Sequence, residues 1–129
     1  MKLLMVSVGA GRFAVAADTV TQILDPDLER DFTRDPESGE VLRLGVRYRV
    51  IHLQEERPDG QSSRLYLVLR AGDGKAMIPV DSADTIQEIP AAAIAPIPSF
   101  IFAADRRAFR GVFSDGREPR LLVDVGALL

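Results

Sequence analysis

The chain has 129 residues, a net charge of -3, no cysteine and a single histidine. This length fits one ordinary domain, or two very small modules that share a core. The missing cysteines exclude disulfides, thiolate zinc sites and thiol catalysis, and the acidic balance disfavours nucleic acid as a partner. No apolar run is as long as a membrane span, and the apolar start is too short for a signal peptide, so we expect a cytoplasmic protein.

The first apolar segments predict a β-hairpin. Residues 3–8 and 12–16 are rich in Val, Leu and Phe and flank a GAG sequence that suits a tight turn. The following apolar residues fall at helical spacing, which predicts a two-turn helix over residues 17–24 with Asp18 as its N-terminal cap. The hairpin is therefore expected to lead directly into a short helix.

An acidic stretch follows, with seven acidic and two basic residues between positions 25 and 40. It suits a solvated loop and also an electrostatic contact for a basic partner, and the two interpretations are compatible. Residues 41–53 then predict two strands on either side of Gly45. A polar segment, residues 54–63, joins this half of the chain to the next.

The second half begins with the same order of elements. Residues 63–70 and 75–80 predict another hairpin, and residues 81–89 predict another short helix. Asp81 and Asp84 stand three positions apart at its start, where they could cap free backbone amides.

The second half ends with a long connection and one more hairpin. Residues 89–102 are apolar and rich in proline, so they either close the core or form a docking surface; core closure is favoured. Residues 110–125 predict a hairpin that turns at the sequence SDG.

A short repeat links the two halves. The sequence ADTVTQI occupies residues 17–23, and ADTIQEI occupies residues 83–89. Both halves therefore read as hairpin, short helix, long connection and hairpin. Each half is too small to bury much core alone. We expect a mainly β protein of two pseudo-symmetric barrels with a shared apolar interface and a groove between them.

Catalytic and cofactor motifs are weak in this sequence. His52 is expected to face solvent, and one histidine without cysteine cannot make an ordinary transition-metal site. Asp81, Asp84 and Asp124 could act as paired carboxylates in an acid–base hydrolase, but caps and turns explain them better. We therefore expect no enzyme, no cofactor and no metal.

Three segments together resemble the CheW-like coupling domain of bacterial chemotaxis. They are FAVAADTVTQIL (residues 13–24), AMIPVDSADTIQEI (residues 76–89) and RGVFSDGREPRLLVDVGALL (residues 110–129). The resemblance implies two intertwined five-stranded β-barrels of the Src homology 3 type with short helices. It also implies one domain over residues 1–129. Its two barrel subdomains would cover about residues 13–60 with C-terminal elements, and about residues 63–125 with N-terminal elements.

The same resemblance implies a non-enzymatic adaptor that binds a CheA-type histidine kinase regulatory domain and the cytoplasmic tip of chemoreceptors. It places two residues on the kinase side, Gln22 and Ile23. It places five in the receptor groove: Val20, Arg43, Gly45, Val80 and Ala83. The alternatives are a regulatory or small-ligand-binding β-barrel, and a scaffold of a kinase pathway outside chemotaxis.

Residues 41–53 depart from the family pattern. The family pattern has an Asn, an Arg-Gly pair and a Pro there, whereas VLRLGVRYRVIHL keeps Gly45 but has neither the Asn, the Pro nor the Arg-Gly order. Arg43 is interpreted as the displaced arginine, and His52 occupies the position where Asp is usual in the family.

Overall fold

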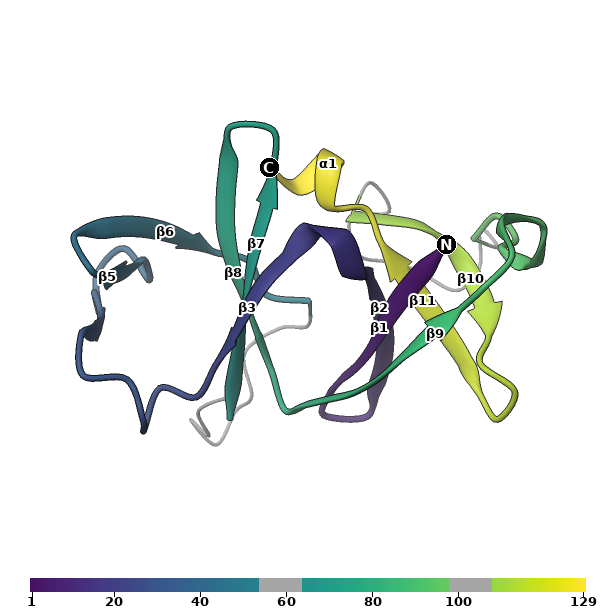
Figure 1. Cartoon of the computed structure of the whole chain (residues 1–129), viewed down its shortest axis with the longest axis horizontal. Coiled ribbons are helices and arrows are strands. Elements are labelled where there is room, and N and C mark those ends of the chain that lie inside the picture. The colour runs from purple at the N-terminus through teal and green to yellow at the C-terminus, as the bar shows by residue number, and fades with distance from the viewer. Residues whose placement is uncertain (54–63, 98–107) are drawn as a thin grey trace.

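The computed structural model describes residues 1–53, 64–97 and 108–129. This part of the chain is mainly β and forms two curled sheets that lie beside each other (Figure 1). Barrel A has the strand order β10-β11-β2-β1-β9, and barrel B has the order β3-β7-β8-β6-β5-β4. The predicted fold class is confirmed, although barrel B has one strand more than the expected five.

The strands of barrel A come from both ends of the chain. They are β1 (Lys2–Val8), β2 (Gly11–Ala16), β9 (Ser82–Glu88), β10 (Phe109–Ser114) and β11 (Pro119–Val123). Barrel B takes its strands from the middle of the chain. They are β3 (Val20–Leu24), β4 (Phe32–Arg34), β5 (Val41–Arg43), β6 (Val46–Val50), β7 (Leu65–Ala71) and β8 (Gly74–Val80). The expected subdomain boundaries stay a prediction. Hairpin β1–β2 shares a sheet with β9 to β11 and not with β3 to β6.

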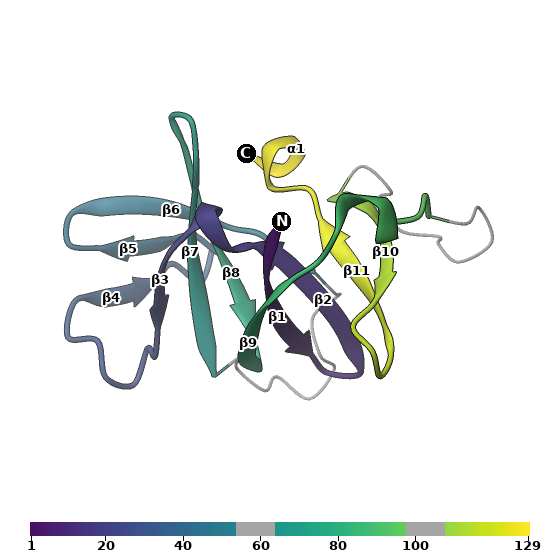
Figure 2. The ribbon, with the colours of Figure 1, turned by 45° about the vertical axis from the view of Figure 1, so that its right-hand side comes forward.

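The two barrels are intertwined by an exchange of strands. Hairpin β1–β2 is followed by β3, which pairs with β7 in the other barrel. Hairpin β7–β8 is followed by β9, which pairs with β1 in the first barrel. Each sheet also contains one parallel pair, β2 with β11 and β8 with β6. The repeat seen in the sequence therefore contains the crossing strand of each half (Figure 2).

The central hairpins bury both faces, which explains their continuous apolar sequences. Alternate residues of a strand point to opposite sides of its sheet. One face of the two hairpins forms a shared core between the barrels; it includes Leu4, Val6, Phe13, Val15, Leu67, Leu69, Ile78 and Val80. The other faces fill the barrels separately, with Leu3 and Met5 inside barrel A and Tyr66 and Val68 inside barrel B. A large-to-small change in the shared core would therefore weaken both barrels.

Both predicted short helices are wrong. Residues 17–23 form only a 3-10 turn, η1 (Ala17–Thr19), before β3 begins, and residues 83–88 lie in strand β9. A two-turn helix is marginal alone, whereas an extended chain here satisfies its backbone groups on the free edge of the opposite hairpin. The same apolar spacing fits either structure, and tertiary pairing decides between them.

The predicted helix caps are wrong for the same reason. The carboxylate of Asp18 caps no amide of η1. Asp81 and Asp84 flank or lie within the strand β9, and the Asp81 carboxylate accepts a hydrogen bond from the backbone N–H of Gly9. Asp124 does cap a helix, α1 (Val125–Leu128), since its Oδ1 lies 3.1 Å from the backbone nitrogen of Ala127.

The four predicted hairpins are confirmed. Residues 41–50 form β5 and β6 around Gly45, and residues 109–123 form β10 and β11. The linker at residues 54–63 lies outside the described residues. Among the described residues, no helix is long and apolar enough to cross a membrane.

The chain after β9 closes barrel A through its backbone. Ile89 and Ile94, on either side of η2 (Ala91–Ala93), pack into the barrel A core, and Ala95 forms a β-bridge with Val112 of β10. A Cβ atom on Gly111 would lie 2.5 Å from the carbonyl oxygen of Ala95, so only glycine fits there. Within residues 89–97, Ile89, Ile94 and Ile97 pack against the core while the other residues are exposed, so core closure is confirmed for these isoleucines alone. Residues 98–107 lie outside the described part.

A buried ion pair also ties the end of barrel A together. Arg120, whose side chain is 7% exposed, donates from Nε to a carboxylate oxygen of Asp115, and from Nη1 to the carbonyl oxygens of Val6 and Phe13 at 3.0 Å each. The Arg120 hydrogen bond, with backbone amides of the same turn, lowers the pKa of Asp115 to about 2. This pair fixes hairpin β10–β11 against hairpin β1–β2.

Candidate partner-binding surfaces

The two predicted kinase-side residues lie next to each other on the edge strand β3 but face different ways. Ile23 pairs in register with the buried Leu67, yet its own side chain is 47% exposed. Gln22 is turned toward strand β5, where its Oε1 accepts a hydrogen bond of 3.0 Å from Nη1 of Arg43. Ile23 is therefore the residue of this pair that offers apolar surface to a partner.

Arg43 closes the seam of barrel B, by which we mean the gap between the outer strand β3 and strand β5. Its side chain is 13% exposed and joins β5 to Gln22 on β3, and its Nη2 lies 3.7 Å from Oε2 of Glu29. Phe32, its neighbour across β4 and β5, contacts the ring of Tyr66 inside the barrel. The family resemblance assigns this guanidinium to the receptor groove, whereas in the structure it contacts Gln22 and Glu29 of the same chain.

Glu29 was not singled out by the sequence. It belongs to the acidic stretch, and nothing in the local pattern distinguishes it from its neighbours. Only the folding of the chain after β3 brings it to Arg43, because the two residues are adjacent in space but not in sequence.

The turn between β5 and β6 holds Leu44 and Gly45. Arg43 and Val46 pair on either side, so the loop has two residues, with φ of 50° at Leu44 and 76° at Gly45. Two successive positive φ values are typical of the type I′ hairpin turn. Gly45 accepts this geometry without strain, whereas leucine does not. The Leu44 side chain is 64% exposed at the tip.

The other three predicted groove residues differ in exposure. Val20 is half-buried and packs against the shared core, and Val80 is completely buried within it. Ala83 is half-buried and lines a groove of about 400 Å³. Val80 therefore lies in the core and not on the surface. Its assignment as a partner contact stays a prediction.

The groove at Ala83 is acidic. Its lining contains three carboxylates, Asp25, Asp27 and Asp81, together with the guanidinium of Arg64. It lies where the chain leaves β3 and where β9 begins, at the junction of the two barrels. A basic side chain of a partner would suit this charge better than an acidic one.

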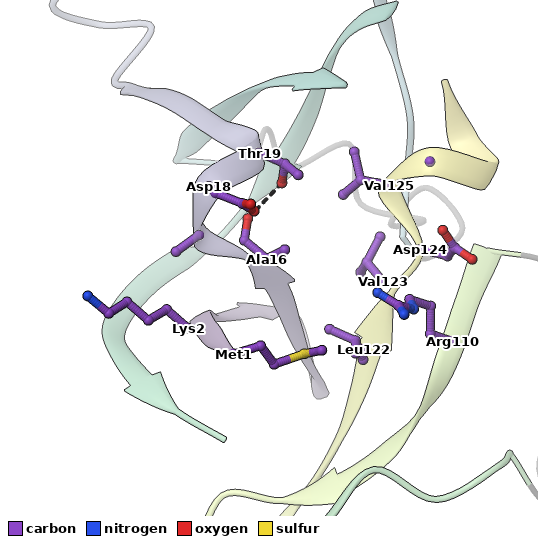
Figure 3. Close-up of a pocket in the computed structure, with 12 residues that line it drawn as sticks. Met1, Lys2, Ala16, Asp18, Thr19, Arg110, Leu122, Val123, Asp124 and Val125 are labelled. Carbon is purple, nitrogen blue, oxygen red and sulfur yellow. Dashed lines mark hydrogen bonds between the residues drawn. The ribbon is translucent and has the colours of Figure 1, made fainter. Parts of the chain in front are cut away.

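A second cavity, of about 760 Å³, lies beside η1 and α1 (Figure 3). Its floor is apolar and includes Met1 and Leu122, whose side chains point toward each other, while Lys2 points away. Asp18 and Arg110 lie at its margins. Because both acidic and basic residues line this cavity, its charge favours neither an anionic nor a cationic ligand.

The carboxylates considered for catalysis are not assembled into a site. Asp81 binds a backbone amide in the β1–β2 turn, and Asp124 caps α1. Asp84 is exposed on β9, and His52 is exposed after β6. Within residues 1–53, 64–97 and 108–129, no three His, Asp or Glu side chains come together to hold a metal.

Comparison with known proteins agrees with the fold. The sequence matches the family described as CheW-like domain over residues 2–129. The chain belongs to the CheW-like domain family. A solved relative in structure is the scaffolding protein TtCheW from Thermoanaerobacter tengcongensis, with a TM-score of 0.76 and 16% identity over 96% of this chain and 84% of that one. No curated protein matches the sequence.

The strand-exchanged fold described above is thus the fold of a member of a chemotaxis scaffold family. In this chain β9 and β3 each lie at one edge of their sheets, and β10 and β4 lie at the opposite edges. Among the predicted site residues, the structure brings Gln22 and Arg43 into contact, leaves Ile23 and Gly45 accessible, and buries Val80.

Proposed function

We propose that this CheW-like chain is a non-enzymatic adaptor of the cytoplasm that couples chemoreceptor tips to a CheA-type histidine kinase. The observation that carries the proposal is the exposed Ile23 on the edge strand β3 of a fold that belongs to the CheW-like family. An exposed, large apolar side chain beside an unpaired strand edge is a feature that binding partners cover.

The kinase side is expected on barrel B, at β3. Ile23 offers about half of its surface, and its backbone is held by register with β7. The regulatory domain of a CheA-type kinase is the partner that the family resemblance assigns to this position. Binding there would cover Ile23 without opening either barrel.

The receptor side is expected at the junction of the barrels, near Ala83. The groove there is lined by Asp25, Asp27 and Asp81, which would attract basic residues on a receptor tip. Ala83 is small, so the groove floor admits a close approach by a helix. Val20 and Val80 support this floor from the shared core.

A binding experiment with the full chain tests the proposal. The regulatory domain of a CheA-type kinase and receptor-tip fragments, taken from the same genome, are titrated against the purified protein. Both should bind. Ile23→Glu should weaken kinase-domain binding at least about tenfold and leave receptor binding intact.

Ile86→Glu is the matched control. Ile86 is 60% exposed and lies on β9, the crossing strand of the other barrel, where it pairs in register with Leu4. The proposal predicts unchanged kinase-domain binding for this variant. Absence of binding to every kinase domain and receptor tip would overturn the proposed function.

A second candidate function is the binding of a small ligand. The cavity of about 760 Å³ beside η1 and α1 favours it, since its size and apolar floor suit a small molecule. Thermal-shift screening with metabolites separates the two functions. Ligand-induced stabilisation that Ala17→Phe, at the half-buried lining of the cavity, abolishes would support this candidate, and it would require no kinase.

A further inference from the structure

The short helix α1 contacts both barrels, although the chain enters it from barrel A. Strand β11 leads through Asp124 into α1, whose first residue, Val125, is buried in the shared core. The other end of α1 lies against barrel B, where Nη2 of Arg49 on β6 donates a hydrogen bond to the carbonyl oxygen of Leu128. Figure 1 shows α1 between β11 and the β7–β8 hairpin. The helix therefore spans the junction of the two barrels.

The turn of hairpin β7–β8 leaves room for the end of α1. A Cβ atom on Gly74 would lie 2.8 Å from Cβ of Leu129 and 3.3 Å from the carbonyl oxygen of Ala71. A side chain at position 74 would thus displace Leu129, so glycine permits the close approach. Leu128 and Leu129 also pack against the shared core. Barrel B holds the end of α1 by a hydrogen bond and by apolar packing.

The beginning of α1 forms one wall of the cavity of about 760 Å³. Asp124, Val125 and Gly126 line the cavity on this side, and Ala17 and Asp18 of η1 line it on the other. Figure 3 shows Val125 and Asp124 across the cavity from Asp18. The residues that contact barrel B follow directly in the chain but do not line the cavity. One helical turn therefore faces the cavity with its first residues and barrel B with its last.

Few hydrogen bonds hold this single turn. The backbone nitrogens of Leu128 and Leu129 lie 3.3 and 3.2 Å from the carbonyl oxygens of Asp124 and Val125, and the Asp124 carboxylate caps the amide of Ala127. A helix of four residues is not stable alone, so its packing at both ends decides whether it forms. Such a turn winds or unwinds as a unit, and any molecule that contacts one end shifts this balance.

We propose that α1 is a strap that transmits occupancy of the cavity to barrel B. A small apolar molecule in the cavity contacts Val125 and Gly126 in their present positions only while the turn is wound. Its binding therefore favours the wound turn, and with it the contacts of Leu128 and Leu129 with barrel B. By linkage, contacts at barrel B favour occupancy of the cavity to the same extent. This inference goes beyond the adaptor function and requires neither kinase nor receptor.

Amide hydrogen exchange of the full chain, followed by NMR, measures the winding of α1. Arg49→Met removes the hydrogen bond to Leu128, and Ala127→Gly lowers the helix propensity at an exposed position outside the cavity lining. Each variant should speed exchange of the Leu128 and Leu129 amides about fivefold, while the amides of β10 and β11 keep their wild-type rates. Arg47→Met, at another exposed position of β6, is the control and should leave all these rates unchanged.

Nile red, a neutral apolar dye, is the probe for the cavity. Saturating dye should slow exchange of the Leu128 and Leu129 amides at least about threefold in the wild type. Ala17→Phe, which fills the cavity from the η1 side, should abolish this protection.

Three results would contradict the inference. Wild-type exchange in both Arg49→Met and Ala127→Gly, or faster exchange that extends to β10 and β11, would show that α1 is not a separate strap. Dye that does not bind, or that binds without protecting the two amides, would overturn the coupling to the cavity. Each result leaves the adaptor function standing, because that function is tested by kinase and receptor binding.

Discussion

The two barrels share a topology but are closed in different ways. Barrel A is closed by its backbone, through the bridge between Ala95 and Val112, and is tied by the buried pair of Arg120 and Asp115. Barrel B is closed at its seam by a long side chain, Arg43, that reaches Gln22. The first closure combines an exposed bridge residue, Ala95, with a buried ion pair, whereas the second depends on one side chain that is 13% exposed. This difference predicts that loss of the barrel A closure lowers stability more than loss of the barrel B closure.

The crossing strands show why exposure alone does not identify a binding site. Ile23 on β3 pairs with Leu67, and Ile86 on β9 pairs with Leu4, so both isoleucines lie opposite a leucine of the shared core. Both are exposed by about half. Their surroundings differ, because Ile23 follows Gln22, whose side chain is hydrogen-bonded to Arg43 of β5. The seam, rather than the isoleucine, distinguishes the two barrels.

The strongest test of this contrast is Arg120→Met in barrel A. The variant leaves the Asp115 carboxylate, which is 6% exposed, without its counterion, and it removes the donor to two backbone carbonyls. We expect a loss of about 3–5 kcal/mol in the free energy of unfolding, measured by urea titration. Arg117→Met in the same turn should change it by less than about 0.5 kcal/mol. Similar losses in the two variants would contradict the role of the buried pair.

The backbone closure of barrel A is tested by Gly111→Ala. The new methyl group would lie 2.5 Å from the Ala95 carbonyl oxygen and 2.7 Å from Cγ2 of Ile94, so the bridge to β10 must separate. We expect a loss of about 3 kcal/mol, seen as a lower melting temperature. Gly126→Ala in α1 meets only Asp124 Oδ1 at 3.6 Å and should be neutral or stabilising. An unchanged melting temperature for Gly111→Ala would show that the bridge is dispensable.

Acid should weaken barrel A through Asp115. Its pKa of about 2 in the folded protein lies below the ordinary value of 3.8, so the folded state prefers the ionised carboxylate. The resulting stabilisation, about 2 kcal/mol, is present above pH 4 and is lost as the pH falls toward 2. Urea titrations at several pH values measure this slope. Asp115→Asn should remove this part of the slope, and an identical slope in the variant would refute the assignment.

The smallest effect is expected for Arg43→Met at the seam of barrel B. Its partners Gln22 and Glu29 can be hydrated when the guanidinium is removed, and its Nε has no hydrogen-bond partner within the described residues. Replacement by an apolar side chain of similar length should keep stability within about 1 kcal/mol of the wild type in urea titration. A loss comparable to that of Arg120→Met would erase the contrast between the two closures.

Much of the strand content could be predicted from local sequence. The hairpin that contains Leu3 to Ala16 and the one that contains Leu65 to Val80 have continuous apolar runs around glycine turns, and this pattern fits strands buried on both faces. The crossing strands could not be distinguished from helices, because Ala17, Val20 and Ile23 fit a helical spacing as well. Their extended structure depends on an edge provided by the other half of the chain.

The candidate site was predictable only in part. Family resemblance indicates Ile23 and Gly45, but it gives no sign that Arg43 contacts both Glu29 and Gln22. These relations connect residues that are far apart along the chain. Val80 shows the reverse case, since its position in the motif suggests a groove residue although its side chain is completely buried.

The sequence by itself determined that this protein is a duplicated, β-rich member of its family. The signals for strands and turns, which are apolar runs and turn glycines, involve only a few neighbouring residues and can therefore be read from the sequence. Only the tertiary structure decided where each crossing strand pairs, which barrel is closed by backbone and which by Arg43, and which apolar residues stay exposed. These features depend on contacts between distant segments, and a local pattern carries no information about which distant edge a strand will join.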